Sequence, residues 1–249
     1  MKYYCFSDIH GHKALFKKIL KFLQKQSEPW KCIFLGDAAD RKEDGYEIIK
    51  YLLNDKEHFI YLKGNHEDML VLAAKAFYKH FAEDRYTLKA HYGESEAEEL
   101  ALLYSYDWDI SLYLQNGGLS TFKDWIRDGA PMRVINALDK LPINYEYTNK
   151  GGKSIYCCHA GHLLDESDSP IWSREHFQEV WPHGLMIHGH TPVRSLMKFG
   201  IVFNPATTNR PAFYQENTKV DIDTGCFYSD TINLMDLDTL ESKVFTTLI

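Results

Sequence analysis

The chain has 249 residues, 45% of them hydrophobic and 14% aromatic, which is enough to bury the core of a soluble globular domain. Its formal net charge of −7 at pH 7 argues against nucleic acid and anionic membranes as partners, because either would repel the chain on average. No apolar stretch is long enough to cross a bilayer and "MKYYCFSDIH" opens without an apolar secretory segment, so we expect a cytoplasmic protein.

The first third of the chain alternates between apolar runs, polar turns and helical patterns. Strand-like runs at 2–6, 31–35 and 58–62 are followed by expected helices near 12–26, near 44–54 and from about 66. In the first helix the apolar residues recur at helical spacing, which leaves a lysine-rich face for solvent. This alternation favours parallel strands joined by helical crossovers.

From about Phe77 to Leu138 the pattern becomes helical, and we expect an inserted, mostly helical subdomain within a single domain of residues 1–249. "QNGG" at 115–118 predicts a turn that ends a helix. Beyond the insertion, "SIYCCHAG" and "GLMIHGHTP" predict strands that end in polar turns. The runs "GIVFN", "KVDIDTGCF", "TINLMDLD" and "SKVFTTLI" then predict a second β-rich layer.

Residue types that bind metals stand directly after five of the expected strands. They are Asp8 and His10, then Asp37, Asn65, His159 and His190. Each alone is typical of a turn or of a hydrogen-bonded histidine, but unrelated turns have no reason to repeat the pattern. Because open α/β sheets bind ligands at the carboxyl ends of their parallel strands, we expect these six residues to form one site.

The donor set predicts the metals and the chemistry. Oxygen and nitrogen donors without thiolates favour Mn, Fe or Zn over calcium or a structural zinc. Six donors suit two divalent or trivalent ions, and we expect Asp37 to bridge them because its strand is central. Two such ions support in-line displacement at phosphorus and make hydroxide available from a shared water near neutral pH. The expected reaction is phosphoester hydrolysis.

Six short segments carry a resemblance to a known family. They are "SDIHG", "GDAADR", "GNHE", "CHAG", "WSR" and "HGHTP", in this order from Ser7 to Pro192. The chain resembles the calcineurin-like metallophosphoesterases, and more closely the bacterial and phage branch of the PPP-type serine/threonine protein phosphatases. The resemblance implies an α/β fold with two packed mixed β-sheets flanked by helices, here with the helical insertion, for which no motif was found. "DIDTG" also looks like a stretch common in bacterial members.

The resemblance also implies roles for individual residues. One metal would be held by Asp8, His10 and Asp37, and the other by Asp37, Asn65, His159 and His190. His66 looks like the general acid that protonates the leaving alkoxide, and Asp40 like the carboxylate that orients it, an arrangement that should raise the histidine pKa. Arg41 and Arg174 look like the phosphate-binding pair, with Asn65 as a further substrate contact.

Two departures from the family patterns bear on these roles. Many relatives outside the PPP branch have Gly-His-x-His, whereas here Pro192 follows Thr191, so the first metal keeps a water or an open position. The PPP pattern "DRG" reads Asp40-Arg41-Lys42 in this chain, which puts the geometry of Arg41 in question.

The sequence thus predicts a dimetal phosphatase for phosphomonoesters, acting on phosphoserine and phosphothreonine in proteins. The substrate partner is a phosphorylated protein or a small phosphoester, and no oligomeric state is specified. One alternative is a hydrolase of dinucleoside polyphosphates or other nucleotide phosphoesters, because the same core serves both substrate classes. Another is a catalytically silent metal-binding scaffold, which would have no need for the acid and both arginines.

Overall fold

Two five-stranded sheets form the centre of the fold in the computed structural model, which describes residues 1–84, 89, 92–162, 169–202 and 208–247. The first sheet has the strand order β10-β9-β1-β2-β3. Its strands are β1 (Lys2–Phe6), β2 (Trp30–Phe34), β3 (Phe59–Tyr61), β9 (Thr231–Asp236) and β10 (Ser242–Thr246). The strands β1, β2 and β3 run parallel, as their alternation with helices predicted, and β9 and β10 add antiparallel strands.

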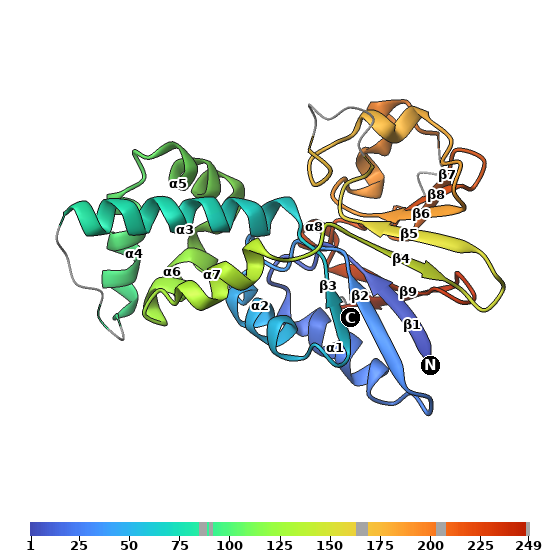
Figure 1. The fold of residues 1–249 in the computed structure, drawn as a ribbon, viewed down its shortest axis with the longest axis horizontal. Helices are drawn as coiled ribbons and strands as arrows, with labels where there is room; N and C mark the ends of the chain where they lie inside the picture. Colours follow the sequence, from blue (N-terminus) through green and yellow to red (C-terminus); the bar gives the residue numbers. More distant parts are fainter. Residues whose placement is uncertain (85–88, 90–91, 163–168, 203–207, 248–249) are drawn as a thin grey trace.

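The second sheet has the order β4-β5-β6-β8-β7. Its strands are β4 (Asn144–Thr148), β5 (Ser154–Cys158), β6 (Leu185–His188), β7 (Ala212–Tyr214) and β8 (Lys219–Asp221). Here β5, β6 and β8 run parallel, while β4 and β7 pair antiparallel at the two edges. Two mixed sheets with flanking helices confirm the predicted fold class (Figure 1).

Alternating side chains on each strand serve two hydrophobic cores. In β1, Cys5 faces the second sheet and packs in one cluster with Ile33, Ile155 and Ile187. Phe6, the next residue, packs on the opposite face in the larger cluster that contains the helices. Since successive side chains of a strand point to opposite faces, a strand covered on both sides must be apolar throughout. This is why the strand-forming runs of the first third are nearly continuous in hydrophobicity.

The helices α1 (Lys13–Leu23) and α2 (Gly45–Asn54) connect the parallel strands of the first sheet. Leu15, Phe16, Ile19 and Leu23 of α1 are buried, whereas its lysines at 17, 18 and 21 are exposed. The predicted amphipathic helix with a solvated lysine face is therefore confirmed, and its apolar face packs in the cluster that contains Phe6 of β1.

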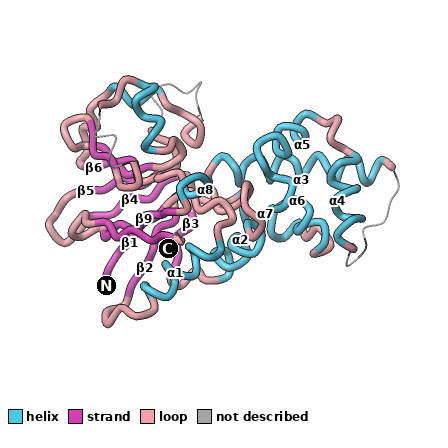
Figure 2. The backbone as a smooth tube through the Cα atoms, turned by 180° about the vertical axis from the view of Figure 1, so that it is seen from behind, coloured by secondary structure: helices cyan, strands magenta, loops and turns pink. Residues whose placement is uncertain are grey.

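A helical lobe lies between β3 and β4 in the sequence and extends to one side of the sheets (Figures 1 and 2). Its helices are α3 (Asn65–Glu83), α4 (Glu94–Leu103), α5 (Trp108–Tyr113), α6 (Leu119–Arg127) and α7 (Met132–Asp139). The expected start of the insertion near Phe77 falls inside α3, so one continuous helix joins the end of β3 to the lobe. There Phe77 packs edge-on against Phe122 and Trp125. The division into one domain with an insertion stays a prediction.

The turn expected at "QNGG" occurs between α5 and α6. Residues Leu114–Gly118 form a widened helical turn, in which Gly117 has a φ of 92° that breaks the helical path. In the second half of the chain, β8, β9 and β10 lie within three of the runs expected as strands. The fourth expected run, at 200–204, has no strand at Ile201 and Val202, and residues 203–204 lie outside the described part. A short helix, α8 (Cys226–Ser229), follows β8.

Crossing a membrane would take a longer and more apolar helix than any found among the described residues.

Candidate metal and phosphate site

Turns at the carboxyl ends of five parallel strands supply most of the predicted site residues. On the first sheet, Asp8 and His10 follow β1, Asp37 follows β2 and Asn65 begins α3 after β3. On the second sheet, His159 follows β5 and His190 follows β6. The five strand ends therefore belong to two sheets and not to a single sheet edge. The residues from the first sheet meet those from the second sheet where both sheets end on the same side of the sandwich.

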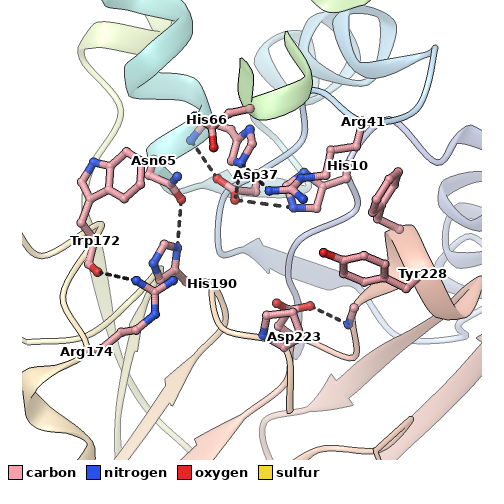
Figure 3. A pocket seen from close by; sticks show the side chains of 14 residues that line it. His10, Asp37, Arg41, Asn65, His66, Trp172, Arg174, His190, Asp223 and Tyr228 are labelled. Carbon is pink, nitrogen blue, oxygen red and sulfur yellow. Dashed lines mark hydrogen bonds and ion pairs between the residues drawn. The ribbon is translucent and has the colours of Figure 1, made fainter. Parts of the chain in front are cut away.

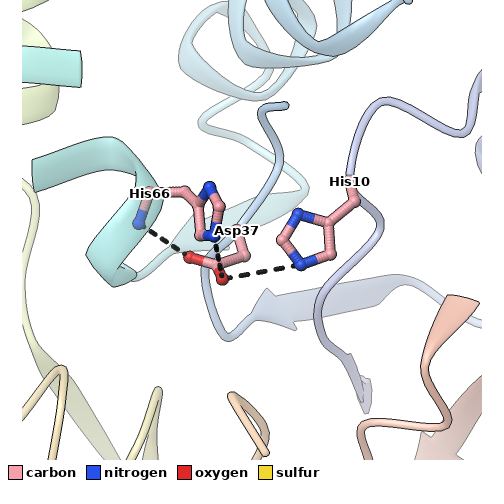
Figure 4. A group of neighbouring side chains, drawn as sticks. All are labelled: His10, Asp37 and His66. Carbon is pink, nitrogen blue, oxygen red and sulfur yellow. Dashed lines mark hydrogen bonds and ion pairs between the residues drawn. The ribbon is translucent and has the colours of Figure 1, made fainter. Parts of the chain in front are cut away.

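Asp37 lies between two groups of potential ligands (Figure 3), and Figure 4 shows it beside His10 and His66. Its Oδ2 is 3.7 Å from His10 Nε2, and its Oδ1 is 3.4 Å from His159 Nε2. Asn65 Oδ1 lies 3.0 Å from His159 Nε2 and 2.9 Å from His190 Nδ1. Ligand atoms of Asp37, His159 and His190 all fall within 4.8 Å of one another. The carboxylate expected to bridge two metals is thus the one that faces both groups.

The tautomers of two histidines fit metal ions. His10 Nδ1 is 3.0 Å from the Ala39 carbonyl, and His159 Nδ1 is 2.8 Å from the Leu35 carbonyl. A carbonyl only accepts, so each Nδ1 carries the proton and each Nε2 presents a lone pair. Both lone pairs face oxygens of the buried Asp37 carboxylate. Lone pairs that face each other repel unless a cation lies between them, as in a metal site whose histidines are held by carbonyls.

Buried atoms without a hydrogen-bond partner and shifted pKa values also indicate a metal site. Among the described residues, Asp8 Oδ1 and His190 Nε2 are buried without a hydrogen-bond partner. Burial, with the charges of Asp8 and Glu67, raises the pKa of Asp37 well above its usual value. Burial also lowers the pKa of His10 to about 3, although Asp8 opposes the shift. Buried lone pairs without a partner and a carboxylate whose negative charge is disfavoured by burial and by neighbouring acids are features that a divalent cation would compensate, so the donor set fits two metals.

His66 lies near the first group but fits a different role. Its ligand atom clusters with those of His10 and Asp37, where the resemblance implied Asp8 instead. However, Arg41 Nη2 is 3.3 Å from His66 Nε2, and a guanidinium there repels a metal cation. Asp8 remains 4.0 Å from His10 Nε2 and has the orphaned oxygen. The geometry therefore favours Asp8 over His66 as the third donor to the first ion.

The Asp40–His66 pair is almost completely buried. His66 Nδ1 is 2.7 Å from Asp40 Oδ2, which fixes the tautomer and leaves Nε2 toward the cleft. Burial raises the pKa of Asp40 to about 7, against hydrogen bonds from Tyr113 and Thr121 that lower it. Burial and the charge of Arg41 lower the pKa of His66 to about 3. The raised histidine pKa expected from the sequence is wrong for the free protein, because desolvation and the guanidinium outweigh the partly neutralised carboxylate.

Backbone strain concentrates at the same residues. Six non-glycine residues at the site have φ between 44° and 72°: Asp8, His10, Asp37, Asp40, Arg41 and His190. Left-handed backbone is costly for residues with a Cβ and gathers at functional sites, where the surrounding fold enforces it. The strand-end turns are therefore shaped to aim these side chains, at an energetic cost.

Two arginines approach the metal-ligand groups from different sides of one cleft (Figure 3). The cleft has a volume of about 200 Å³, and both Arg41 and Arg174 line it together with Asn65 and His190. Arg174 is half-buried, and its Nε donates to Thr191 Oγ1 at 2.8 Å. Two guanidiniums facing one small cleft are suited to the oxygens of a phosphate group.

Further residues that line the cleft were not predicted from the sequence: Asn116, Trp172, Asp223, Phe227 and Tyr228. Asp223 is buried, and its pKa is raised by that burial and by the charge of Asp8. "DIDTG" and "WSR" contain Asp223 and Trp172, so their motifs gave a signal that could have been followed. Phe227 and Tyr228 had none, because only the folding of α8 brings them to the cleft.

Comparisons with known proteins place this geometry in context. The sequence matches the family model of the calcineurin-like phosphoesterases over residues 1–228. No curated protein matches the chain significantly.

Three solved structures illustrate the similarity of the fold. A chain assigned as a diadenosine tetraphosphatase aligns at a TM-score of 0.55 and 13% identity, covering 98% of this chain and 92% of that one. The cold-active protein-tyrosine phosphatase of a psychrophilic Shewanella species aligns at 0.55 and 14%, covering 98% and 77%. A protein serine/threonine phosphatase from Saccharomyces cerevisiae aligns at 0.51 and 12%, covering 100% and 81%. At these identities the likeness shows the fold alone.

Proposed function

Because the chain belongs to the calcineurin-like phosphoesterases, a family of metal-dependent phosphoester hydrolases, we propose that it is a phosphomonoesterase acting on phosphoserine and phosphothreonine in proteins. One observation carries the proposal. His66, held by the buried Asp40, and two arginines line one cleft together with members of both groups of candidate metal ligands. A scaffold that only binds metal has no physical need for the acid pair or the arginines.

The family depends on two metal ions, and the chain offers two His/Asp groups for them. We assign Asp8, His10 and Asp37 to one ion, and Asp37, Asn65, His159 and His190 to the other. Their oxygen and nitrogen donors favour Mn, Fe or Zn. When bound, the ions supply Lewis-acid activation of water and of the phosphoryl oxygens.

Arg41 and Arg174 bind and orient the phosphoryl group. Each guanidinium can donate two parallel hydrogen bonds to phosphate oxygens, and Asn65 lines the same cleft. In the free protein Arg41 donates to His66 Nε2. A phosphate dianion competes for that guanidinium and neutralises the charge that lowers the His66 pKa. Substrate binding thereby raises the His66 pKa at the moment a proton donor is needed.

His66 protonates the leaving oxygen. Asp40 holds Nδ1, so Nε2 is the atom that can carry the transferred proton into the cleft. A positioned general acid of this kind contributes about 10² to 10⁴ in rate, most when the leaving group is a poor one such as a serine or threonine alkoxide. The acid pair therefore supports an alkyl phosphate as substrate.

The choice of phosphoprotein rests on the resemblance of "GDAADR" and "GNHE" to the PPP-type phosphatases. The fold is also shared with the yeast serine/threonine phosphatase, which is compatible with this choice without deciding it. The nucleotide-phosphoester alternative uses the same core, so rates on phosphopeptides and on dinucleoside tetraphosphates must be compared directly. A higher kcat/KM for the dinucleoside tetraphosphate than for the phosphopeptides would replace the proposed substrate class.

The basic test is hydrolysis of an aryl phosphate by the full chain with added Mn, and again with a chelator. We expect turnover with Mn and its loss on chelation while the protein stays folded by circular dichroism. Asp37→Asn, which weakens both metal groups, is the matched inactive control. Lack of activity with Mn, Fe and Zn alike, or activity that survives chelation, would disprove the proposal.

A further inference from the structure

We infer that Tyr113 and Thr121, two residues of the helical lobe, are positioning residues that hold Asp40 in place behind the general acid His66. The inference rests on the proposed function, since it assigns a task within the same site. No sequence motif covers either residue, and neither lines the cleft. Both act through Asp40.

Tyr113 completes a buried chain of hydrogen bonds. Its hydroxyl donates to Asp40 Oδ1 at 2.5 Å, while the other carboxylate oxygen lies 2.7 Å from His66 Nδ1. The two oxygens of the Asp40 carboxylate thus connect Tyr113 of the lobe to the proposed general acid His66. Tyr113 and Asp40 are 0% exposed and His66 is 2% exposed, so water cannot replace either contact. In such a dry network each hydrogen bond fixes the geometry of the next.

Thr121 holds the backbone of the same turn. The Asp40 amide donates to Thr121 Oγ1 at 3.0 Å, and the amide of Arg41 donates to the Gly117 carbonyl at 3.0 Å. Asp40 and Arg41 have φ values of 72° and 67°, so two consecutive non-glycine residues adopt left-handed backbone. Such backbone persists only where its surroundings enforce it. Both amides of the strained turn are bound by the lobe, which therefore also positions the phosphate-binding Arg41.

The phenol of Tyr113 is itself tightly held. A Cβ added at Gly118 would come within 2.6 Å of the Tyr113 ring carbons, so the backbone there packs directly against the ring. Phe122 meets the same ring edge-on, with centroids 5.8 Å apart. A ring confined on two sides presents its hydroxyl at one place, which is what a positioning contact requires.

The kinetic test uses Tyr113→Phe in the metal-loaded full chain, which keeps the ring and removes the hydroxyl. We expect kcat on a phosphoserine peptide to fall by about tenfold or more, because the general acid loses its fixed geometry. The kcat on 4-nitrophenyl phosphate, whose leaving group needs little protonation, should change by less than about twofold, and KM should stay constant for both substrates.

Tyr78→Phe is the matched control. It removes a tyrosine hydroxyl that donates to the Ala130 carbonyl in the lobe, away from Asp40. Thr121→Val and Thr121→Ser form a second pair, in which only serine keeps the acceptor for the Asp40 amide. We expect Val to reproduce the leaving-group effect and Ser to rescue it. Equal losses on both substrates, or the same losses in Tyr78→Phe, would overturn the inference.

A measurement without turnover separates this inference from the proposed function. In metal-free protein labelled with ¹⁵N-histidine, His66 should show one tautomer with the proton on Nδ1, its signals being identified by their loss in His66→Asn. In Tyr113→Phe we expect a mixture of tautomers. An unchanged tautomer in Tyr113→Phe would overturn the positioning role. Absence of hydrolysis by the wild type would instead refute the proposed function and leave the tautomer result to decide the contact.

Discussion

Asp37 illustrates how the site works at the scale of single residues. Its Oδ1 accepts a hydrogen bond from the His66 amide at 3.1 Å, and its own amide donates to Glu67 Oε2 at 2.8 Å. Its carboxylate faces both groups of candidate metal ligands. The carboxylate is buried beside other acids, which raises its pKa. Hydrogen bonds hold both the backbone and the carboxylate of Asp37, and neighbouring acids leave its negative charge uncompensated. The side chain is therefore positioned for a cation before the cation binds.

Metal binding should therefore release protons. The raised pKa of Asp37 means that its carboxylate keeps a proton to a higher pH than an ordinary aspartate does, and this proton must leave before the carboxylate can bind an ion. His10, with its pKa lowered to about 3, is already neutral and releases none. Mn affinity should therefore increase as the pH rises, measured by calorimetry in buffers of different ionisation enthalpy. An affinity independent of pH, or one that falls as pH rises, would contradict this.

His66→Asn should separate proton donation from metal binding. Asparagine removes the acid but leaves the neighbouring ligands, so Mn stoichiometry should be unchanged. We expect kcat on alkyl phosphates to fall by about 10² to 10⁴, and kcat on aryl phosphates with acidic leaving groups to fall least. A series of aryl and alkyl esters measures this dependence. A uniform loss across the series would remove His66 from the role of acid.

Arg174→Gln should weaken phosphate binding. The substitution removes a guanidinium that lines the cleft and donates to Thr191, while Arg41 remains. The Ki of inorganic phosphate and the KM of substrates should rise by about tenfold, the loss of a charge-assisted contact of about 1.5 kcal/mol. Arg127→Gln, at an arginine exposed beside Asp124, is the control and should leave both constants unchanged. Unaltered phosphate inhibition in Arg174→Gln would exclude the assigned contact.

At the scale of elements, the start of α3 joins two strands of the first sheet. The carboxylate of Glu67, in the first turn of this helix, is fully buried and accepts four hydrogen bonds. Their donors are the amides of Asp37, Ala38 and Gly64 and the hydroxyl of Tyr61. From the sequence, Glu67 could not be distinguished from an ordinary first-turn acid. In the fold it fixes the turn after β2 to the turn after β3, and so sets Asp37 relative to Asn65.

Glu67→Gln should accordingly destabilise the fold. The new amide group points a donor at other donors, which leaves buried amides unsatisfied and costs about 3 kcal/mol. Urea unfolding should show a lower midpoint with an unchanged slope. Glu57→Gln, at an exposed glutamate, should stay within about 0.5 kcal/mol of the wild type. Equal midpoints for Glu67→Gln and the wild type would show that these four hydrogen bonds contribute nothing net.

At the scale of the whole molecule, the site is where the two sheets and the helical lobe meet. The first sheet supplies Asp8, His10, Asp37 and Asn65, the second supplies His159 and His190, and the lobe holds the turn of Asp40. Ions bound in the assigned way would connect the two sheets across the end of the sandwich. Metal binding is therefore linked to the stability of the whole fold.

Mn should raise the melting temperature. Binding at about 100 times Kd adds about 2.7 kcal/mol per site, which for a chain of this size corresponds to roughly 5–10 °C. Differential scanning calorimetry at increasing Mn measures the shift. His159→Ala, which removes a donor of the second sheet, should shrink it. A shift of the same size in that variant would show that the ion binds elsewhere.

Much of this could be predicted from the sequence, because it is encoded locally. The parallel strands of the first sheet and the helices between them follow from the alternation of apolar and polar residues. The six candidate ligands follow from residue types at strand ends, whereas the acid pair and the arginines follow from the resemblance of short motifs to a known family. The structure brings all ten residues into one region. Their roles stay predictions until the metals and the kinetics are measured.

Chain order and side-chain chemistry determined by themselves which residues follow each strand and that a metal-dependent phosphoester chemistry suits them. Tertiary structure alone decided that the candidate ligands come from two sheets and that burial and Arg41 lower the pKa of His66. It also decided that Tyr113 donates a hydrogen bond to Asp40 from 73 positions away. The reason is physical. Desolvation and hydrogen bonds act over a few ångströms, and residues distant in sequence reach that separation only when the chain is folded.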